Sequence, residues 1–203
     1  MTAVVVAVVV GYLVGSASPA SLVARARGVD LRGGGSGNPG ATNAGRLLGR
    51  KIGVLVALLD VAKGALPSAL FGLVAHDAGL AAGAAAVLGH ITSPWLRGRG
   101  GKGVATAGGA ILGSHPLWAP IVIGVWIVVA LTTRWVALAS ICAALALPVV
   151  VLVADRAVVE LAWALPIALL VVARHRRNLI RWWAVRHAPA SDGPSRLERG
   201  RPL

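Results

Sequence analysis

The sequence has few charged residues and almost no cysteine. Only 13% of its 203 residues are charged, whereas about a quarter are charged in an ordinary soluble domain. A chain with so little charge cannot cover its own surface with polar groups, which excludes a free-standing soluble domain. The single cysteine, Cys142, excludes an internal disulfide and has no companion for a metal site.

Acidic residues are especially scarce, with seven in the whole chain. A membrane CDP-alcohol phosphotransferase would need clustered aspartates that bind metal ions. The aspartates outside the C-terminal tail are Asp30, Asp60, Asp77 and Asp155, which are far apart in the sequence. We therefore discount that class of enzyme.

Apolar residues make up 57% of the chain, and the mean hydropathy is +0.77. Lipid must therefore be the solvent, and a crossing helix needs roughly 17–25 apolar residues. The sequence predicts an all-α membrane protein with about seven transmembrane helices, at residues 2–23, 52–75, 78–95, 104–113, 117–133, 135–154 and 157–173. We expect the short fourth segment to be tilted or broken. The first segment lacks the basic N-terminal region and the cleavage site of a signal peptide, so we expect it to remain as a transmembrane span.

The chain divides into a membrane domain, residues 1–187, and a basic tail, residues 188–203, whose Pro, Gly, Ser and Arg content predicts disorder. The net charge is +13, and its distribution indicates topology. With the N-terminus outside and the C-terminus cytoplasmic, all lysines and arginines except Lys63 and Arg156 fall in cytoplasmic segments. This bias explains the charge without nucleic-acid binding.

The first polar segment on the cytoplasmic side is rich in glycine and spans residues 28–49. Glycines let the backbone approach a ligand, and successive exposed N–H groups form an anion-binding concavity. Polar side chains that can bond a ligand accompany these glycines, namely those of Ser36, Asn38, Thr42, Asn43 and Arg46. A flexible linker is the alternative, but a linker does not need these polar side chains.

The second segment, GRGGKGVAT at residues 98–106, places Lys102 among glycines just before a predicted helix. A helix N-terminus beside a lysine attracts phosphate. The segment is not a Walker loop, because Leu96 and Gly103 stand where a glycine and a serine or threonine are needed. The alternative is a lysine that only sets topology.

The third segment, RHRRNLIRWW at residues 174–183, follows the last predicted span. His175 and Asn178 are three apart and would share a helix face that points into a polar cleft. We interpret the arginines at 176, 177 and 181 as lipid-headgroup anchors. The two tryptophans are expected in the interfacial belt.

Three polar residues fall inside or at the end of predicted spans. Asp60 and Lys63 are three apart and can form an ion pair, and a role in supporting the cleft is the alternative. His90 lies near the inner end of the third span, where it would be either a cleft residue or a polar cap.

Together these strings resemble the PlsY family of bacterial acyl-phosphate:glycerol-3-phosphate acyltransferases. The resemblance runs from Gly15 to about Arg181 and is carried by GSGNPGATN at 35–43, LLDVAKG at 58–64, GH at 89–90, GGKGVAT at 100–106, RWVALAS at 134–140 and HRRN at 175–178. Several positions depart from the family pattern: the stretch 91–99, Ala137 in place of a serine, and His187 in place of a glutamate.

The resemblance implies a multi-pass cell-membrane enzyme whose active site faces the cytoplasm. It would transfer a fatty acyl group from acyl phosphate to the sn-1 hydroxyl of glycerol 3-phosphate, the first step of phospholipid synthesis, without metal or cofactor. The residues that the resemblance assigns to catalysis are Ser36, Arg46, Lys102, His175 and Asn178. Those assigned to substrate binding are Gly37, Asn38, Thr42, Asn43, Ser140 and His90. Acyl chain length and oligomeric state stay open.

The sequence offers no conventional acyl-transfer base or nucleophile. A His-x4-Asp string occurs only at His187 and Asp192, where it spans Pro189 at the start of the predicted tail, and no Gly-x-Ser-x-Gly elbow is present. We therefore expect direct attack by the substrate hydroxyl, with a substrate phosphate oxygen or His175 accepting the proton. The rival hypothesis is a transporter of a phosphorylated anion.

Overall fold

The structure, a computed structural model, describes residues 1–154 and 158–187. Within these residues the regular elements are all helical: α1 (Thr2–Ser16), α2 (Pro19–Ala26), α3 (Ala41–Leu48), α4 (Arg50–Gly72), α5 (His76–Thr92), the 3-10 turn η1 (Pro94–Leu96), α6 (Val104–Ser114), α7 (Ala119–Thr133), α8 (Val136–Val153) and α9 (Val158–His187). The predicted all-α class is confirmed. The predicted tail, 188–203, and the charged residues Asp155 and Arg156 lie outside the described residues.

Four stretches of the described chain are long and apolar enough to cross a membrane, namely Thr2–Ala26, Arg50–Gly72, Val136–Val153 and Val158–Ala184. The helices Val104–Ser114 and Ala119–Thr133 are apolar but shorter. The predicted count of seven crossings and the predicted sides of the two termini therefore stay predictions.

The first predicted span is not one continuous helix. Helix α1 ends at Ser16, and α2 begins at Pro19 with the Ser18 hydroxyl accepting from the Ser21 N–H at 3.3 Å. The break occurs because proline lacks an N–H, and its ring would collide with the carbonyl one turn earlier. The carbonyls freed there accept from Lys63 Nζ at Ala17 (2.6 Å) and from Ser93 Oγ at Ser16 (2.6 Å).

Helix α9 runs to His187, so residues 174–183 continue the helix of the last predicted span. His175 and Asn178 therefore share a helix face, as expected. His76 and Asp77, which lie between two predicted spans, belong to the start of α5, and residues 73–75 connect it to α4.

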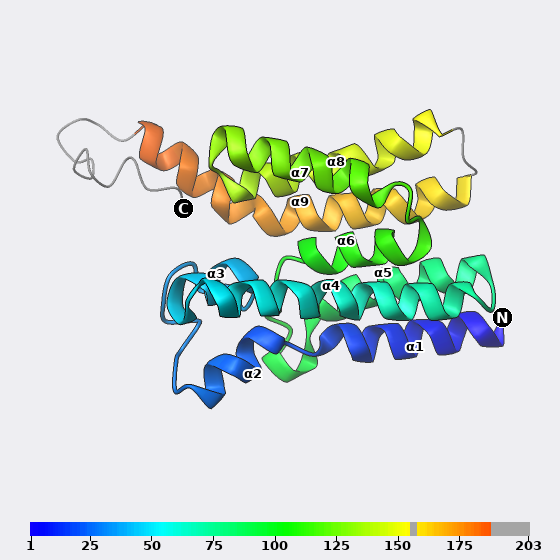
Figure 1. Cartoon of the computed structure of the whole chain (residues 1–203), viewed down its shortest axis with the longest axis horizontal. Helices are drawn as coiled ribbons and strands as arrows, with labels where there is room; N and C mark the ends of the chain where they lie inside the picture. The colour runs from blue at the N-terminus through cyan, green and yellow to red at the C-terminus, as the bar shows by residue number, and fades with distance from the viewer. Residues whose placement is uncertain (155–157, 188–203) are drawn as a thin grey trace.

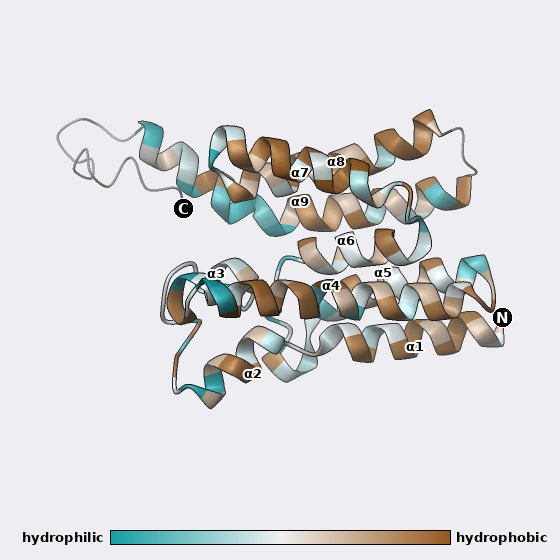
Figure 2. Ribbon diagram, in the orientation of Figure 1, coloured by the Kyte–Doolittle hydropathy of each residue, from teal (hydrophilic) through white to brown (hydrophobic). Residues whose placement is uncertain are grey.

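The helices form two packed groups (Figure 1). Helices α1, α4, α5 and α6 contact one another, and α7, α8 and α9 form the second group. A cluster of buried apolar residues that includes Val87, Ile111 and Leu147 joins the groups. The most hydrophilic stretches gather near α3 and the end of α9 (Figure 2). The outside exposes side chains such as Leu58, Leu131 and Leu169, as expected for contact with lipid.

Glycines bring the helices of the first group into close contact. A Cβ at Gly15 of α1 would overlap the Ala86 carbonyl of α5, and a Cβ at Gly64 of α4 would overlap the Thr106 carbonyl of α6. Small residues at helix interfaces are the usual means of close packing in lipid, where burial of apolar surface drives little association. The positions of α5 and α6, which flank the basic loop, therefore depend on these glycines.

We predict that Gly15→Ala destabilises the protein by about 1–3 kcal/mol, because the added methyl overpacks a backbone contact. The measurement is the thermal unfolding midpoint of purified protein in detergent. Gly124→Ala is the matched control, since Gly124 lies in α7 with nothing within 4 Å of an added Cβ. Equal midpoints for the two variants would contradict this account of the packing.

Candidate active site

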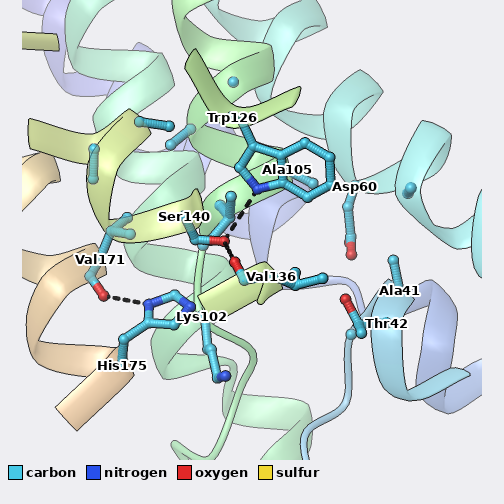
Figure 3. Close-up of a pocket in the computed structure, with 18 of the residues that line it drawn as sticks. Ala41, Thr42, Asp60, Lys102, Ala105, Trp126, Val136, Ser140, Val171 and His175 are labelled. Atoms are coloured by element: carbon cyan, nitrogen blue, oxygen red, sulfur yellow. Dashed lines mark hydrogen bonds between the residues drawn. The ribbon is translucent and has the colours of Figure 1, made fainter. Parts of the chain in front are cut away.

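A cavity of about 440 Å³ lies between the two helix groups. Its walls come from α3, α4 and α6 on one side and from α7, α8 and α9 on the other. Figure 3 shows Thr42 and Asp60 facing Ser140, Trp126 and His175 across it. All of the predicted site residues except Gly37 line this cavity: Ser36, Asn38, Thr42, Asn43, Arg46, His90, Lys102, Ser140, His175 and Asn178.

The first glycine-rich loop folds around the side chain of Asn43. The amide oxygen of Asn43 accepts from the Ser36 N–H at 2.8 Å, and its Nδ2 donates to the carbonyls of Leu31 (2.9 Å) and Gly34 (3.2 Å). Gly35 has φ +58°, a conformation that suits glycine, and a Cβ there would overlap the Asn43 oxygen. Asn43 thus shapes the loop and positions Ser36, while Arg46 follows one turn later on α3.

The glycines of the second loop pack it against the end of α5. The N–H groups of Gly100 and Gly101 donate to the carbonyls of Ile91 and His90, both at 3.0 Å, so these two N–H groups are committed to the protein backbone. A Cβ at Gly100 would overlap the His90 carbonyl, and one at Gly101 would overlap the His90 ring. The glycines therefore permit close docking of the loop on the end of α5, and His90 supports the loop that carries Lys102.

Lys102 joins this loop to α9. Its Nζ donates to Asn178 Oδ1 at 2.7 Å, and Arg174 donates to the carbonyls of Gly101 (3.2 Å) and Gly100 (3.0 Å). Burial and, to a smaller extent, the positive charges of Arg46, Arg174 and Arg181 together lower the pKa of Lys102 to about 8. Three guanidinium groups around an ammonium group make this end of the cavity favourable for an anion. No sequence pattern singled out Arg174 as a site residue. Its role is recognised only from its contacts with the loop carbonyls.

His175 is buried, with 2% of its surface exposed. Its Nδ1 is 2.8 Å from the Val171 carbonyl, which can only accept, so Nδ1 carries the proton and Nε2 holds the lone pair. Ser140 donates to the Val136 carbonyl at 2.8 Å and accepts from Trp126 Nε1 at 3.2 Å (Figure 3). Its hydroxyl hydrogen is thus committed to the backbone, which leaves Ser140 an acceptor toward the cavity.

Asp60 and Lys63 form the ion pair that the sequence allowed, with Lys63 Nζ 2.9 Å from Asp60 Oδ1. His90 Nδ1 lies 3.5 Å from the same oxygen. Asp60 also lines the cavity. The ion pair therefore offsets two buried charges and also contributes a carboxylate to the cavity wall. Among the described lining residues Asp60 supplies the only carboxylate, and its charge is offset by these partners.

The remaining wall is apolar. Side chains such as Val61, Ile111, Ile123, Leu147 and Ile167 line it, together with the indole of Trp126. No sequence signal separates these residues from the other aliphatic residues of the spans, so sequence reasoning missed them. A cavity with cations at one end and aliphatic side chains elsewhere suits a ligand with an anionic head and a hydrocarbon chain.

Comparison with known proteins shows the family of the chain. A family model described as Glycerol-3-phosphate acyltransferase matches residues 5–185. The chain is 43% identical over 178 residues to the glycerol-3-phosphate acyltransferase of Geobacter sulfurreducens, covering 85% of this chain and 90% of that protein. It is 41% identical over 178 residues to the Aquifex aeolicus protein of that name, covering 86% of this chain and 92% of that protein.

Two solved structures are also similar. The crystal structure of PlsY, an integral membrane glycerol 3-phosphate acyltransferase, in its glycerol 3-phosphate form has a TM-score of 0.84 and 39% identity, covering 89% of this chain and 92% of that chain. The lysophosphatidic acid form has a TM-score of 0.82 and 38% identity, with the same coverage.

We predict that Gly100→Ala detaches the loop 97–103 from the end of α5, because the methyl would overlap the His90 carbonyl. The measurement is amide hydrogen exchange, in which the Gly100 and Gly101 N–H groups lose protection. Gly108→Ala in α6 is the control, since an added Cβ there meets nothing within 4 Å. Unchanged protection in Gly100→Ala would show that the loop does not depend on this contact.

Proposed function

Because the chain belongs to the glycerol-3-phosphate acyltransferase family, we propose that it transfers a fatty acyl group from acyl phosphate to the sn-1 hydroxyl of glycerol 3-phosphate. The products are lysophosphatidic acid and inorganic phosphate. The observation that carries this proposal is the two-part cavity, in which Arg46 and Lys102 stand at one end and aliphatic side chains line the rest. Acyl phosphate has the matching shape, a phosphate head on a hydrocarbon chain.

Ser36, Arg46 and Lys102 hold the phosphate groups of the two substrates. Both substrates are anions, so bringing them together costs electrostatic repulsion, which the surrounding cations offset. Thr42 lines the same cavity as Ser36 and Asn38 and contacts the donor's phosphate in this scheme. Fixing both substrates in one cavity turns the encounter into an effectively intramolecular step.

Asn178, His175 and Ser140 place the glycerol 3-phosphate. The sn-1 hydroxyl oxygen forms a bond to the acyl carbon, and the bond between that carbon and the phosphate oxygen breaks. The departing phosphate takes the electron pair, and the hydroxyl proton passes to a phosphate oxygen or to Nε2 of His175. No covalent acyl-enzyme forms in this scheme, in keeping with the lack of an activated nucleophile in the described cavity wall.

The site faces the cytoplasm in this proposal. The cationic end of the cavity lies near α3 and the end of α9, while α1 begins at the opposite end of the bundle (Figure 1). The basic segments 24–51, 97–103 and 174–186 are all on the α3 side, which is the side that the positive-inside bias retains in the cytoplasm.

The activity is tested with purified protein in detergent, where no compartments exist. We expect phosphate release from acyl phosphate only when glycerol 3-phosphate is present, with lysophosphatidic acid formed in equal amount. Acyl-CoA and acyl carrier protein are the alternative donors. Transfer from a thioester instead of acyl phosphate would overturn the donor assignment, and substrate binding without turnover would favour a transporter.

The same assay tests the phosphate site. Arg46→Ala and Lys102→Ala each remove a charge-assisted contact and are expected to lower kcat/KM by about 10²–10³-fold. Lys51→Ala is the matched control, because Lys51 is an exposed cation at the start of α4 that does not line the cavity.

The pH dependence of the reaction tests Lys102 separately. An anionic substrate favours the protonated ammonium, so binding weakens as pH rises through the pKa of about 8 in the free protein. We expect kcat/KM, which reports the free enzyme, to fall about tenfold per pH unit above that value. Because arginine stays charged, Lys102→Arg should remove this decline. A flat wild-type profile would rule out a protonated Lys102 as a phosphate ligand.

A further inference from the structure

Three side chains of metal-binding type converge at the end of the bundle opposite the cationic loops. His76 begins α5, His115 directly follows α6, and Glu160 lies in the first turn of α9. One ring nitrogen of each histidine and one carboxylate oxygen all lie within 4.8 Å of one another. The helix ends that carry them lie close together at the end where α1 begins (Figure 1).

Glu160 is the unusual member of this cluster, because it is only 9% exposed. Its Oε1 is 3.1 Å from His76 Nε2, but its Oε2 is buried with no hydrogen-bond partner among the described residues. A buried carboxylate with one oxygen unsatisfied is costly. The contact with His76 alone therefore does not account for the placement of Glu160.

His115 is held in the form that a metal ligand needs. Its Nδ1 is 3.0 Å from Ser114 Oγ, and that hydroxyl donates its own hydrogen to the Ala110 carbonyl at 2.8 Å. Donation from Nδ1 to that hydroxyl fits a histidine that binds a metal ion through its other ring nitrogen, Nε2. Trp118 stacks on the ring with centroids 3.8 Å apart and fixes its plane. An outer hydrogen bond of this kind is the usual support for a metal-binding histidine.

We propose that His76, His115 and Glu160 form a binding site for a divalent transition-metal ion, with Zn²⁺ the best match. Two imidazoles and one carboxylate suit zinc, with a fourth position left for water. Ca²⁺ and Mg²⁺ prefer all-oxygen sites, which this cluster does not offer. Tetrahedral zinc would set the ligand atoms roughly 3.3 Å apart. The His76 side chain is 53% exposed, so it has room to rotate into place.

The site would connect the two helix groups. His76 and His115 belong to the group of α5 and α6, and Glu160 belongs to α9 in the other group. A bound ion would fix the distance between these helix ends, at the far side of the seam that contains the cavity. The proposal does not depend on the acyl donor or on the catalytic residues.

The test uses full-length protein in detergent, with any polyhistidine tag removed and metals stripped with a chelator. Zn²⁺ is titrated against a fluorescent zinc indicator, and Co²⁺ is added separately to record the visible bands of a tetrahedral site. We expect one equivalent of Zn²⁺ per chain and a higher thermal unfolding midpoint when it is bound. Binding of no Zn²⁺ equivalent would overturn the proposal.

Variants separate this site from surface binding. His76→Ala should weaken Zn²⁺ binding by at least about 100-fold, because even outer-sphere partners are worth 10–100-fold, and acyl transfer should be unchanged. Glu160→Gln should lose the Co²⁺ bands. His187→Ala is the control, since His187 is an exposed histidine at the end of α9. If His76→Ala and Glu160→Gln bind Zn²⁺ as the wild type does, the cluster is only a hydrogen-bonded contact between helices.

Discussion

A buried ion pair in α4 connects that helix to two other segments of the chain, the break between α1 and α2 and the end of α5. Lys63 reaches both Asp60 and the Ala17 carbonyl that the helix break at Pro19 leaves unpaired. Asp60 in turn lies 3.5 Å from His90. Charges and open carbonyls are expensive in a lipid environment unless they satisfy one another. The break in the first span and the charges in the second therefore stabilise each other, because the carbonyl exposed by the break accepts a hydrogen bond from the buried lysine.

That arrangement reaches the site through His90. The carbonyl of His90 accepts from the Gly101 N–H, and the missing side chains at Gly100 and Gly101 let the loop lie directly on the end of α5. Lys102 then projects into the cavity from a loop fixed on one side by α5 and on the other by Arg174 and Asn178 of α9. A lysine held in this way meets an anion without first paying the entropy of ordering a flexible side chain.

The convergence of Ser36, Arg46, Lys102 and Asn178 could be predicted from the sequence. An anion site needs cationic side chains and glycines that let the backbone approach the ligand, and few segments of the chain contain both. The hydrogen bonds of the Gly100 and Gly101 N–H groups could not be predicted, because their acceptors are carbonyls at the end of α5, and local sequence patterns do not show which carbonyls a loop will meet. The break before Pro19 had a local sequence signal, namely a serine followed by a proline, but the continuous hydropathy of residues 2–23 predicted one unbroken span. Trp126 and the aliphatic wall could not be predicted, because any span residue could have faced the cavity.

The seam between the two helix groups is fastened by polar contacts at both ends. Near the loops, Lys102 bonds to Asn178 and Arg174 bonds to the loop carbonyls, while at the far end His76 meets Glu160. Between these ends the wall of the cavity is largely aliphatic. Polar contacts can therefore fix the separation of the groups while the middle of the seam stays free to accept a hydrocarbon chain, which needs no hydrogen bonds. Because such a wall recognises a chain by volume and contact alone, specificity for the head group must come from the cationic end.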